Sequence, residues 1–127
     1  MKALVIDDSR VMRRIVSSTL EDLGFETIHA GNGQEALDVL EKDADVDLAC
    51  IDWNMPVMNG YDFVVRVRER REWRGVTLMM VTSEAEHGQI VRALAAGAHE
   101  YLIKPFTPDA LRDKLDLLGL TSLRELA

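Results

Sequence analysis

Five short apolar segments alternate along the chain with stretches whose apolar residues recur at helical spacing. The short segments are rich in aliphatic and β-branched residues, as is typical of strands buried on both faces of a parallel sheet. The predicted strands cover residues 3–6, 26–30, 47–52, 76–81 and 101–103. Strand–helix alternation repeated five times predicts an α/β fold of the doubly wound (βα)5 type, a five-stranded parallel sheet with helices on both faces.

A predicted helix follows each strand. The first begins after Ser9, a residue type that caps helix N-termini, and ends before Gly24. The others cover residues 33–42, 61–70 and 85–96 and the stretch after Thr107, with a loop at 54–60. Apolar spacing predicts the buried stripe of the first helix, formed by Met12, Ile15, Val16, Thr19, Leu20 and Leu23.

Length and charge narrow the class of protein. The 127 residues fit one domain, which we assign to residues 1–119, with 120–127 as a short extension or the start of a linker. A net charge of -7 argues against nucleic-acid binding, which needs a basic face. No apolar run approaches the roughly 20 residues of a membrane span, and the N-terminal one is too short for a signal peptide. We therefore expect a cytoplasmic protein without membrane insertion, in which Cys50 is simply buried.

Polar side chains lie at the carboxyl ends of four of the predicted strands. In an open parallel sheet these ends form one edge, where binding sites arise. The side chains expected there are Asp7, Asp8, Asp52, Thr82, Ser83 and Lys104. Three acids close together repel one another, and a hard divalent cation such as Mg²⁺ relieves the repulsion. Asp7 and Asp8 alone would be read as helix-capping acids; their convergence with Asp52 favours a metal site.

The remaining groups at this edge suit phosphoryl transfer. Asp52 is a candidate nucleophile, and the Lys104 ammonium and the Thr82 hydroxyl are candidates to bind the oxygens of the transferred group. Ser83 is small and leaves room for an incoming group. Taken singly, Lys104 could extend to solvent and Thr82 could bond local backbone.

The chain resembles the receiver domains of two-component response regulators over nearly its full length. The resemblance rests on six segments in order: Val5-Ile6-Asp7-Asp8, Met12-Arg13-Arg14-Ile15-Val16, Leu23-Gly24-Phe25, Asp52-Trp53-Asn54-Met55-Pro56, Met80-Val81-Thr82 and Lys104-Pro105-Phe106-Thr107. It implies the strand order 2-1-3-4-5 and a cis Lys104–Pro105 peptide bond.

The resemblance also implies a role for each site residue. Asp52 is the phosphorylated aspartate. Mg²⁺, or Mn²⁺ in its place, is held by Asp7, Asp8, Asp52 and the backbone carbonyl of Asn54. Thr82 and Lys104 sense the phosphoryl group, and Tyr101 is the switch aromatic. Asn54 and Glu84 occupy the positions that tune hydrolysis of the acyl phosphate, and this pair implies a short-lived phosphoryl state.

The implied function is that of a phosphorylation-activated response regulator, a phosphoacceptor that catalyses its own phosphorylation and dephosphorylation and not a turnover enzyme. Its partners are a sensor histidine kinase, CheA-like or other, and an output target bound by the surface of the fourth helix, fifth strand and fifth helix, including Ile90, Tyr101 and Lys114. A stand-alone chemotaxis-type regulator is favoured; the alternative is a receiver domain excised from a longer regulator with an effector domain.

Two other functional interpretations disagree with the sequence, one in the spacing of its acids and one in the residues that are present. A phosphatase of the haloacid-dehalogenase type needs a second Asp two residues after its nucleophile on the first strand, and Ser9 stands there. A receiver-like module with a purely structural role would lack an acid, the Thr or the Lys, and all are present.

Several other residues are expected at the protein surface or near the metal site. The three histidines are expected at the surface: His29, His87 and His99. The arginines at the end of the third helix are expected to form a solvated helix end: Arg66, Arg68, Arg70, Arg71 and Arg74. Trp53 is expected near the metal site.

Overall fold

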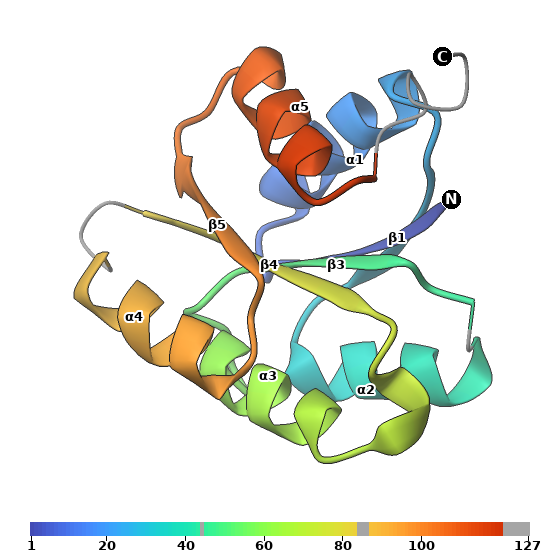
Figure 1. The fold of residues 1–127 in the computed structure, drawn as a ribbon, viewed down its shortest axis with the longest axis vertical. Coiled ribbons are helices and arrows are strands. Elements are labelled where there is room, and N and C mark those ends of the chain that lie inside the picture. The colour runs from blue at the N-terminus through green and yellow to red at the C-terminus, as the bar shows by residue number, and fades with distance from the viewer. Residues whose placement is uncertain (44, 84–86, 121–127) are drawn as a thin grey trace.

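The computed structural model in Figure 1 describes residues 1–43, 45–83 and 87–120, apart from the side chain of His87. Its centre is a five-stranded parallel sheet with the order β2-β1-β3-β4-β5. The strands are β1 (Lys2–Ile6), β2 (Glu26–Ala30), β3 (Leu48–Ile51), β4 (Thr77–Ser83) and β5 (Glu100–Lys104). Both the predicted fold class and the predicted strand order are confirmed.

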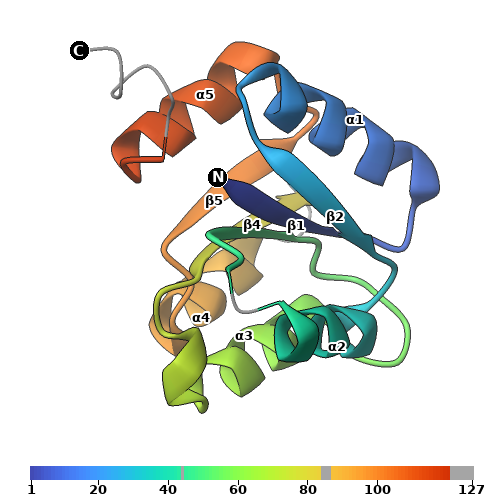
Figure 2. The ribbon, with the colours of Figure 1, turned by 90° about the vertical axis from the view of Figure 1, so that its right-hand side faces the viewer.

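Helices cover both faces of this sheet, α1 and α5 on one side and α2, α3 and α4 on the other (Figures 1 and 2). The helices are α1 (Arg10–Asp22), α2 (Gly33–Lys42), α3 (Gly60–Arg68), α4 (His87–Ala96) and α5 (Pro108–Leu117), with a 3-10 turn η1 (Arg71–Trp73) after α3. Side chains cap four of the helices, accepting bonds from backbone N–H groups of the first turn: Ser9, Asn32, Asn59 and Thr107. The turn η1 was not predicted, and the predicted start of α4 at residue 85 lies outside the described residues.

The two faces of the sheet carry separate cores, because successive side chains of a strand point to opposite sides. In β1, Leu4 and Ile6 pack with α2, α3 and α4, whereas Ala3 and Val5 pack with α1 and α5. All four are at most 1% exposed. Because β1 is apolar on both of its faces, helices pack against it on both sides of the sheet.

The predicted stripe of α1 needs one correction. Val16 and Leu20 are buried, but the Ile15 side chain is 46% exposed, although its spacing placed it in the stripe. Ile15 lies instead beside Met12, Pro105 and Phe106, where it lines an apolar groove of about 410 Å³. The stripe facing the sheet is thus narrower than the 3.6-residue pattern indicated.

The arginine cluster also differs from the solvated helix end that was expected. Arg68 is half-buried, and its guanidinium donates to the carbonyls of Gly97, Trp73 and Val76. Arg70 stacks on the Trp73 ring at 4.2 Å and pairs with two carboxylates, those of Glu41 and Glu72. These two arginines tie α3 to its neighbours, while Arg66, Arg71 and Arg74 are exposed as expected.

Of the three histidines, His29 and His99 are exposed as expected. His99 nevertheless has a structural contact, since its Nδ1 accepts a bond from the backbone N–H of Leu78 at 3.1 Å and lies 3.3 Å from Arg68. Desolvation of this ring, and then the charge of Arg68, lower the pKa of His99. The ring is therefore a neutral acceptor at the start of β4.

Among the described residues, none of the helices is both long enough and apolar enough to cross a membrane.

Candidate functional site

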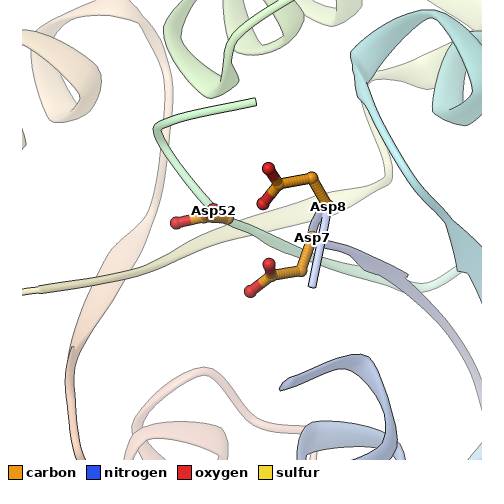
Figure 3. Close-up of side chains that lie close together, drawn as sticks. All are labelled: Asp7, Asp8 and Asp52. Carbon is orange, nitrogen blue, oxygen red and sulfur yellow. The ribbon is translucent and has the colours of Figure 1, made fainter. Parts of the chain in front are cut away.

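Residues from four strands meet at one edge of the sheet. Asp7 and Asp8 follow β1 directly, Asp52 follows β3, and Thr82 and Lys104 lie within the last two residues of β4 and β5. Figure 3 shows the three carboxylates gathered in the space between the ends of β1 and β3. The sequence therefore placed these side chains at the correct edge, and the sheet order brings them together.

The three carboxylates form a compact cluster. One oxygen from each of Asp7, Asp8 and Asp52 lies within 4.8 Å of the others. Asp7 is 4% exposed and Asp52 is 8% exposed, whereas Asp8 is exposed. Negative charges at this spacing repel strongly where water is excluded, so the cluster needs positive charge.

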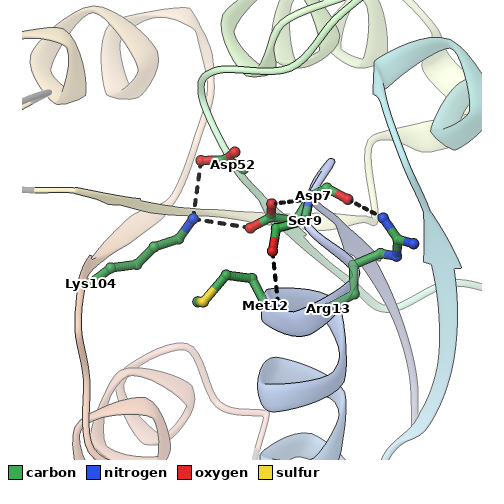
Figure 4. Close-up of polar contacts among 6 residues, drawn as sticks. All are labelled: Asp7, Ser9, Met12, Arg13, Asp52 and Lys104. Carbon is green, nitrogen blue, oxygen red and sulfur yellow. Dashed lines mark hydrogen bonds and ion pairs between the residues drawn. The ribbon is translucent and has the colours of Figure 1, made fainter.

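Lys104 supplies part of that charge. Its Nζ lies 3.0 Å from Asp7 Oδ2 and 3.2 Å from Asp52 Oδ1, so one ammonium bridges two buried acids (Figure 4). Burial acts to lower the pKa of Lys104, but the bonds to Asp7 and Asp52 outweigh it and raise the pKa above the ordinary value. Lys104 is therefore charged, and three carboxylates share one cation among the described side chains.

A second set of bonds holds Asp7 in place. Its Oδ1 accepts from the backbone N–H of Ser9 at 2.9 Å, and its carbonyl accepts from Arg13 Nη1 at 2.5 Å. Ser9 in turn caps α1 by accepting from the N–H of Met12 (Figure 4). With Oδ1 used by Ser9 and Oδ2 by Lys104, the orientation of the Asp7 carboxylate is set from both sides.

Thr82 carries a hydroxyl that has no hydrogen-bond partner among the described residues. The residue is 1% exposed, and its Oγ1 is buried. A buried hydroxyl without a partner is unfavourable by roughly 1–3 kcal/mol and calls for an explanation. An oxygen-bearing group arriving at Asp52 would supply an acceptor near the end of β4.

Gly60, which the sequence indicated only as a breaker of the 54–60 loop, also shapes the site. A Cβ added at Gly60 would lie 2.3 Å from the carbonyl oxygen of Asp52. The Gly60 N–H donates to the carbonyl of Trp53 at 2.9 Å, which closes the loop after β3. A glycine that begins a helix soon after a strand-end acid is the signal that could have indicated this close approach.

The other predicted residues surround this cluster. Asn54, two residues after Asp52 in the chain, is exposed. Trp53 is 6% exposed and packs on Tyr61 with ring centroids 5.6 Å apart. Tyr101 is half-buried on β5, opposite Met80 of β4, with Lys114 Nζ 4.5 Å from its ring. The Lys104–Pro105 peptide bond is cis, as expected. Glu84 lies outside the described residues.

The fold and the site resemble those of known proteins. Residues 3–116 match the family model of the response regulator receiver domain. A CheY homolog, a chemotaxis protein of Campylobacter jejuni, is 45% identical over 124 residues, which cover 96% of this chain and 95% of that protein. Among solved structures, the chemotaxis response regulator CheY4 of Vibrio cholerae is 38% identical, with a TM-score of 0.84 and coverage of 92% of this chain and 97% of that one.

A third match was solved with a metal. The receiver domain of a sensor histidine kinase from Pseudomonas aeruginosa has a magnesium ion coordinated in the active site cleft. It is 27% identical to this chain, with a TM-score of 0.82 and coverage of 91% of this chain and 94% of that one. From its fold, its strand-end cluster and these matches, the chain belongs to the response regulator receiver domain family.

Proposed function

We propose that this protein is switched by phosphorylation of Asp52, which accepts a phosphoryl group from a sensor histidine kinase. The observation that carries the proposal is the Asp7–Asp8–Asp52 cluster bridged by Lys104. It combines a buried carboxylate nucleophile with groups that bind phosphoryl oxygens and a divalent cation. Membership of the receiver family supports this role.

The donor set fits Mg²⁺. The ion prefers oxygen ligands, takes one or two carboxylates and keeps several waters, and here three carboxylate oxygens lie within 4.8 Å of one another, with Asp8 open to solvent. We assign the site to Asp7, Asp8, Asp52 and the backbone carbonyl of Asn54, with Mn²⁺ as a substitute. When bound, the cation neutralises charge on the transferred oxygens.

Transfer then proceeds at the Asp52 carboxylate. One of its oxygens attacks the phosphorus of a phosphohistidine, an O–P bond forms, and the P–N bond breaks. The electron pair of that bond goes to the imidazole nitrogen, which takes a proton from water. Lys104, which already contacts Asp52, holds an oxygen of the arriving group as a point charge. Hydrolysis of the acyl phosphate restores Asp52, so the protein is a phosphoacceptor that acts on itself and is not a metabolic enzyme.

The switch passes through Thr82. Phosphorylation adds about two negative charges. The Thr82 hydroxyl, which finds no partner in the part of the chain that the structure describes, gains an acceptor. Movement of the end of β4 is transmitted to Tyr101, whose neighbour on β4 is Met80. The surface formed by α4, β5 and α5, including Lys114, then binds its output target with a changed affinity through a population shift. Ile90, which was expected on this surface, is only 3% exposed and belongs to the core beneath it.

The kinase partner must bring a phosphohistidine to this edge. The apolar groove of Met12, Ile15, Pro105 and Phe106 borders Lys104 and offers a protein-docking surface next to the acceptor. Relatives that are chemotaxis proteins, 45% and 43% identical, favour a stand-alone chemotaxis-type regulator served by a CheA-like kinase. We assign the receiver domain to residues 1–119.

The decisive experiment is phosphorylation by acetyl phosphate with Mg²⁺, followed by intact-mass analysis. Wild type should gain one phosphoryl group and Asp52→Asn should gain none. Asp38→Asn, which removes an exposed carboxylate of α2, is the matched control and should label like wild type. Equal labelling of wild type and Asp52→Asn would remove the basis of the proposal.

The lifetime of the phosphoryl group tests the tuning positions, Asn54 and Glu84. We expect a short-lived acyl phosphate with Mg²⁺ present, because this pair matches that of the chemotaxis regulators. Decay is followed by the loss of the added mass after the donor is removed. An acyl phosphate that persists for hours contradicts the assignment.

A further inference from the structure

A polar groove of about 530 Å³ lies between α1 and β2, on the side of α1 away from the apolar groove of Ile15. Its lining includes Arg10, Arg13, Arg14, Ser17, Glu21 and His29. The α1 residues recur at spacings of three and four, which places them on one face of the helix. This groove contributes nothing to the site described above except through Arg13.

The charge of this groove is opposite to that of the protein. The chain carries 22 acidic and 15 basic residues, yet the named lining holds three guanidinium groups against one carboxylate. None of Arg10, Arg13 and Arg14 forms an ion pair with another residue in the described parts of the chain. The carboxylate of Glu21 accepts instead from the Thr27 hydroxyl at 2.7 Å.

Arg13 has an unused donor in this setting. Its Nη1 donates to the carbonyl of Asp7, as Figure 4 shows, while its Nε is buried and has no acceptor among the described residues. Beside it, His29 Nε2 and Ser17 Oγ lie 2.8 Å apart and form a hydrogen bond on the β2 side of the groove. An arginine fixed at one nitrogen and unsatisfied at another is poised to receive a bidentate anion.

We propose that this groove binds a small phosphomonoester, whose phosphate is held by Arg13 together with Arg10 and Arg14. A phosphate dianion matches the net charge of the named lining, three guanidinium groups less one carboxylate. The groove is larger than a bare phosphate requires and falls within the range of roughly 300–1,000 Å³ usual for small-molecule sites. Ser17 and Ser18 line the remaining space, which the rest of the ligand would occupy.

The test is a titration of the full chain with ribose 5-phosphate, followed by ¹⁵N NMR in metal-free buffer with EDTA. Without metal, the carboxylate cluster repels anions, so any site seen is distinct from the phosphoacceptor. We expect the Arg13 Nε–H resonance to move downfield as it gains an acceptor, with saturable shifts in α1 and at His29. Ribose, which lacks the phosphate, should produce no such shifts.

Paired charge variants separate a built site from general attraction. Arg10→Gln combined with Arg14→Gln changes two exposed residues of the groove and should weaken binding by about tenfold or more. Arg71→Gln with Arg74→Gln removes the same charge at the other end of the sheet, near η1, and should leave binding within about twofold of wild type because screened surface charges act weakly at a distance.

Three results would overturn the proposal: equal weakening by both pairs, an Arg13 Nε–H that does not respond, or binding of a short poly-glutamate peptide in place of ribose 5-phosphate. Because the measurement uses no metal and no phosphorylation, its outcome is independent of the function proposed for Asp52.

Discussion

Replacing Lys104 with methionine removes the ammonium that bridges two buried acids. Its Nζ lies 3.0 and 3.2 Å from the oxygens of Asp7 and Asp52. At an effective dielectric of about 20, each pair is worth about 5 kcal/mol before desolvation is subtracted. Removing one partner of a buried ion pair lowers stability by about 3–5 kcal/mol net. Because Asp8 is exposed, we expect a loss at the low end of this range for the cluster. We therefore expect Lys104→Met to lower the free energy of unfolding by about 3 kcal/mol in metal-free buffer.

The assay is urea unfolding followed by circular dichroism, with EDTA present. Lys114→Met is the matched control, because Lys114 Nζ lies 3.1 Å from a single carboxylate, that of Glu100, at a more exposed position. It should cost no more than about 1 kcal/mol. If Lys104→Met is as stable as wild type, the ammonium does not offset the repulsion among the acids, and the electrostatic account of the site is wrong.

The same variant should bind Mg²⁺ more tightly, because Lys104 and the cation compete for the same carboxylates. Repulsion between a single and a double positive charge at one cluster exceeds about 1.4 kcal/mol even at the dielectric of water, which corresponds to tenfold in affinity. The buried Trp53 next to Asp52 reports the titration by its fluorescence. Unchanged or weaker Mg²⁺ affinity contradicts the shared-ligand assignment.

The dependence of stability on alkaline pH gives an independent test of the contribution of Lys104. Since the pKa of Lys104 is raised in the folded protein, its stabilising contribution is complete below the ordinary value of 10.5 and is lost as the pH rises through the folded pKa. The stability gap between wild type and Lys104→Met should therefore stay constant from pH 7 to 9, in the range below that value, and close only above 10.5. If the stability gap closes near neutral pH, the charge of Lys104 is not the source of the stability difference.

Three further predictions concern single side chains. Thr82→Val should stabilise the unphosphorylated protein by about 1 kcal/mol in urea unfolding, because it removes a buried hydroxyl that lacks a partner within residues 1–43, 45–83 and 87–120. It should also reduce the stabilisation that beryllofluoride with Mg²⁺ gives. A destabilised variant would show that the hydroxyl is satisfied. Val57 is 81% exposed and has a φ of 69°, which is unfavourable for a residue with a Cβ. Val57→Gly should therefore raise the free energy of unfolding by about 1 kcal/mol, and Val57→Ala should raise it by less. No gain from glycine would mean that the backbone is unstrained. The pKa of His99 is lowered by desolvation and by Arg68, so neutral His99 stabilises the fold above its ordinary pKa of 6.5 and this stabilisation is lost as the pH falls. His99→Gln should therefore flatten the decline in stability below that pH. An unchanged decline would show that other groups cause it.

Much of the fold and of the site could be predicted from local pattern. The run from Ala3 to Ile6 predicts a strand buried on both faces, and all four of its side chains are buried. Asp7, Asp52 and Lys104 were placed at one edge because parallel strands present their carboxyl ends together. Strand order and the cis bond before Pro105 came from the family resemblance, since neither periodicity nor composition specifies them.

What the sequence determined by itself is the set of elements and the chemical groups at their ends, because the periods of strand and helix are local properties of the chain. Only the tertiary structure decided that Lys104 reaches Asp7, 97 residues away, and that Arg68 turns inward to three carbonyls. It also decided that the Thr82 hydroxyl is buried with no partner from the described segments. Each of these depends on how strands and helices pack at ångström scale, and spacing along the chain carries no information on it. The same packing exposes Ile15 and leaves the guanidinium groups of α1 lining a groove.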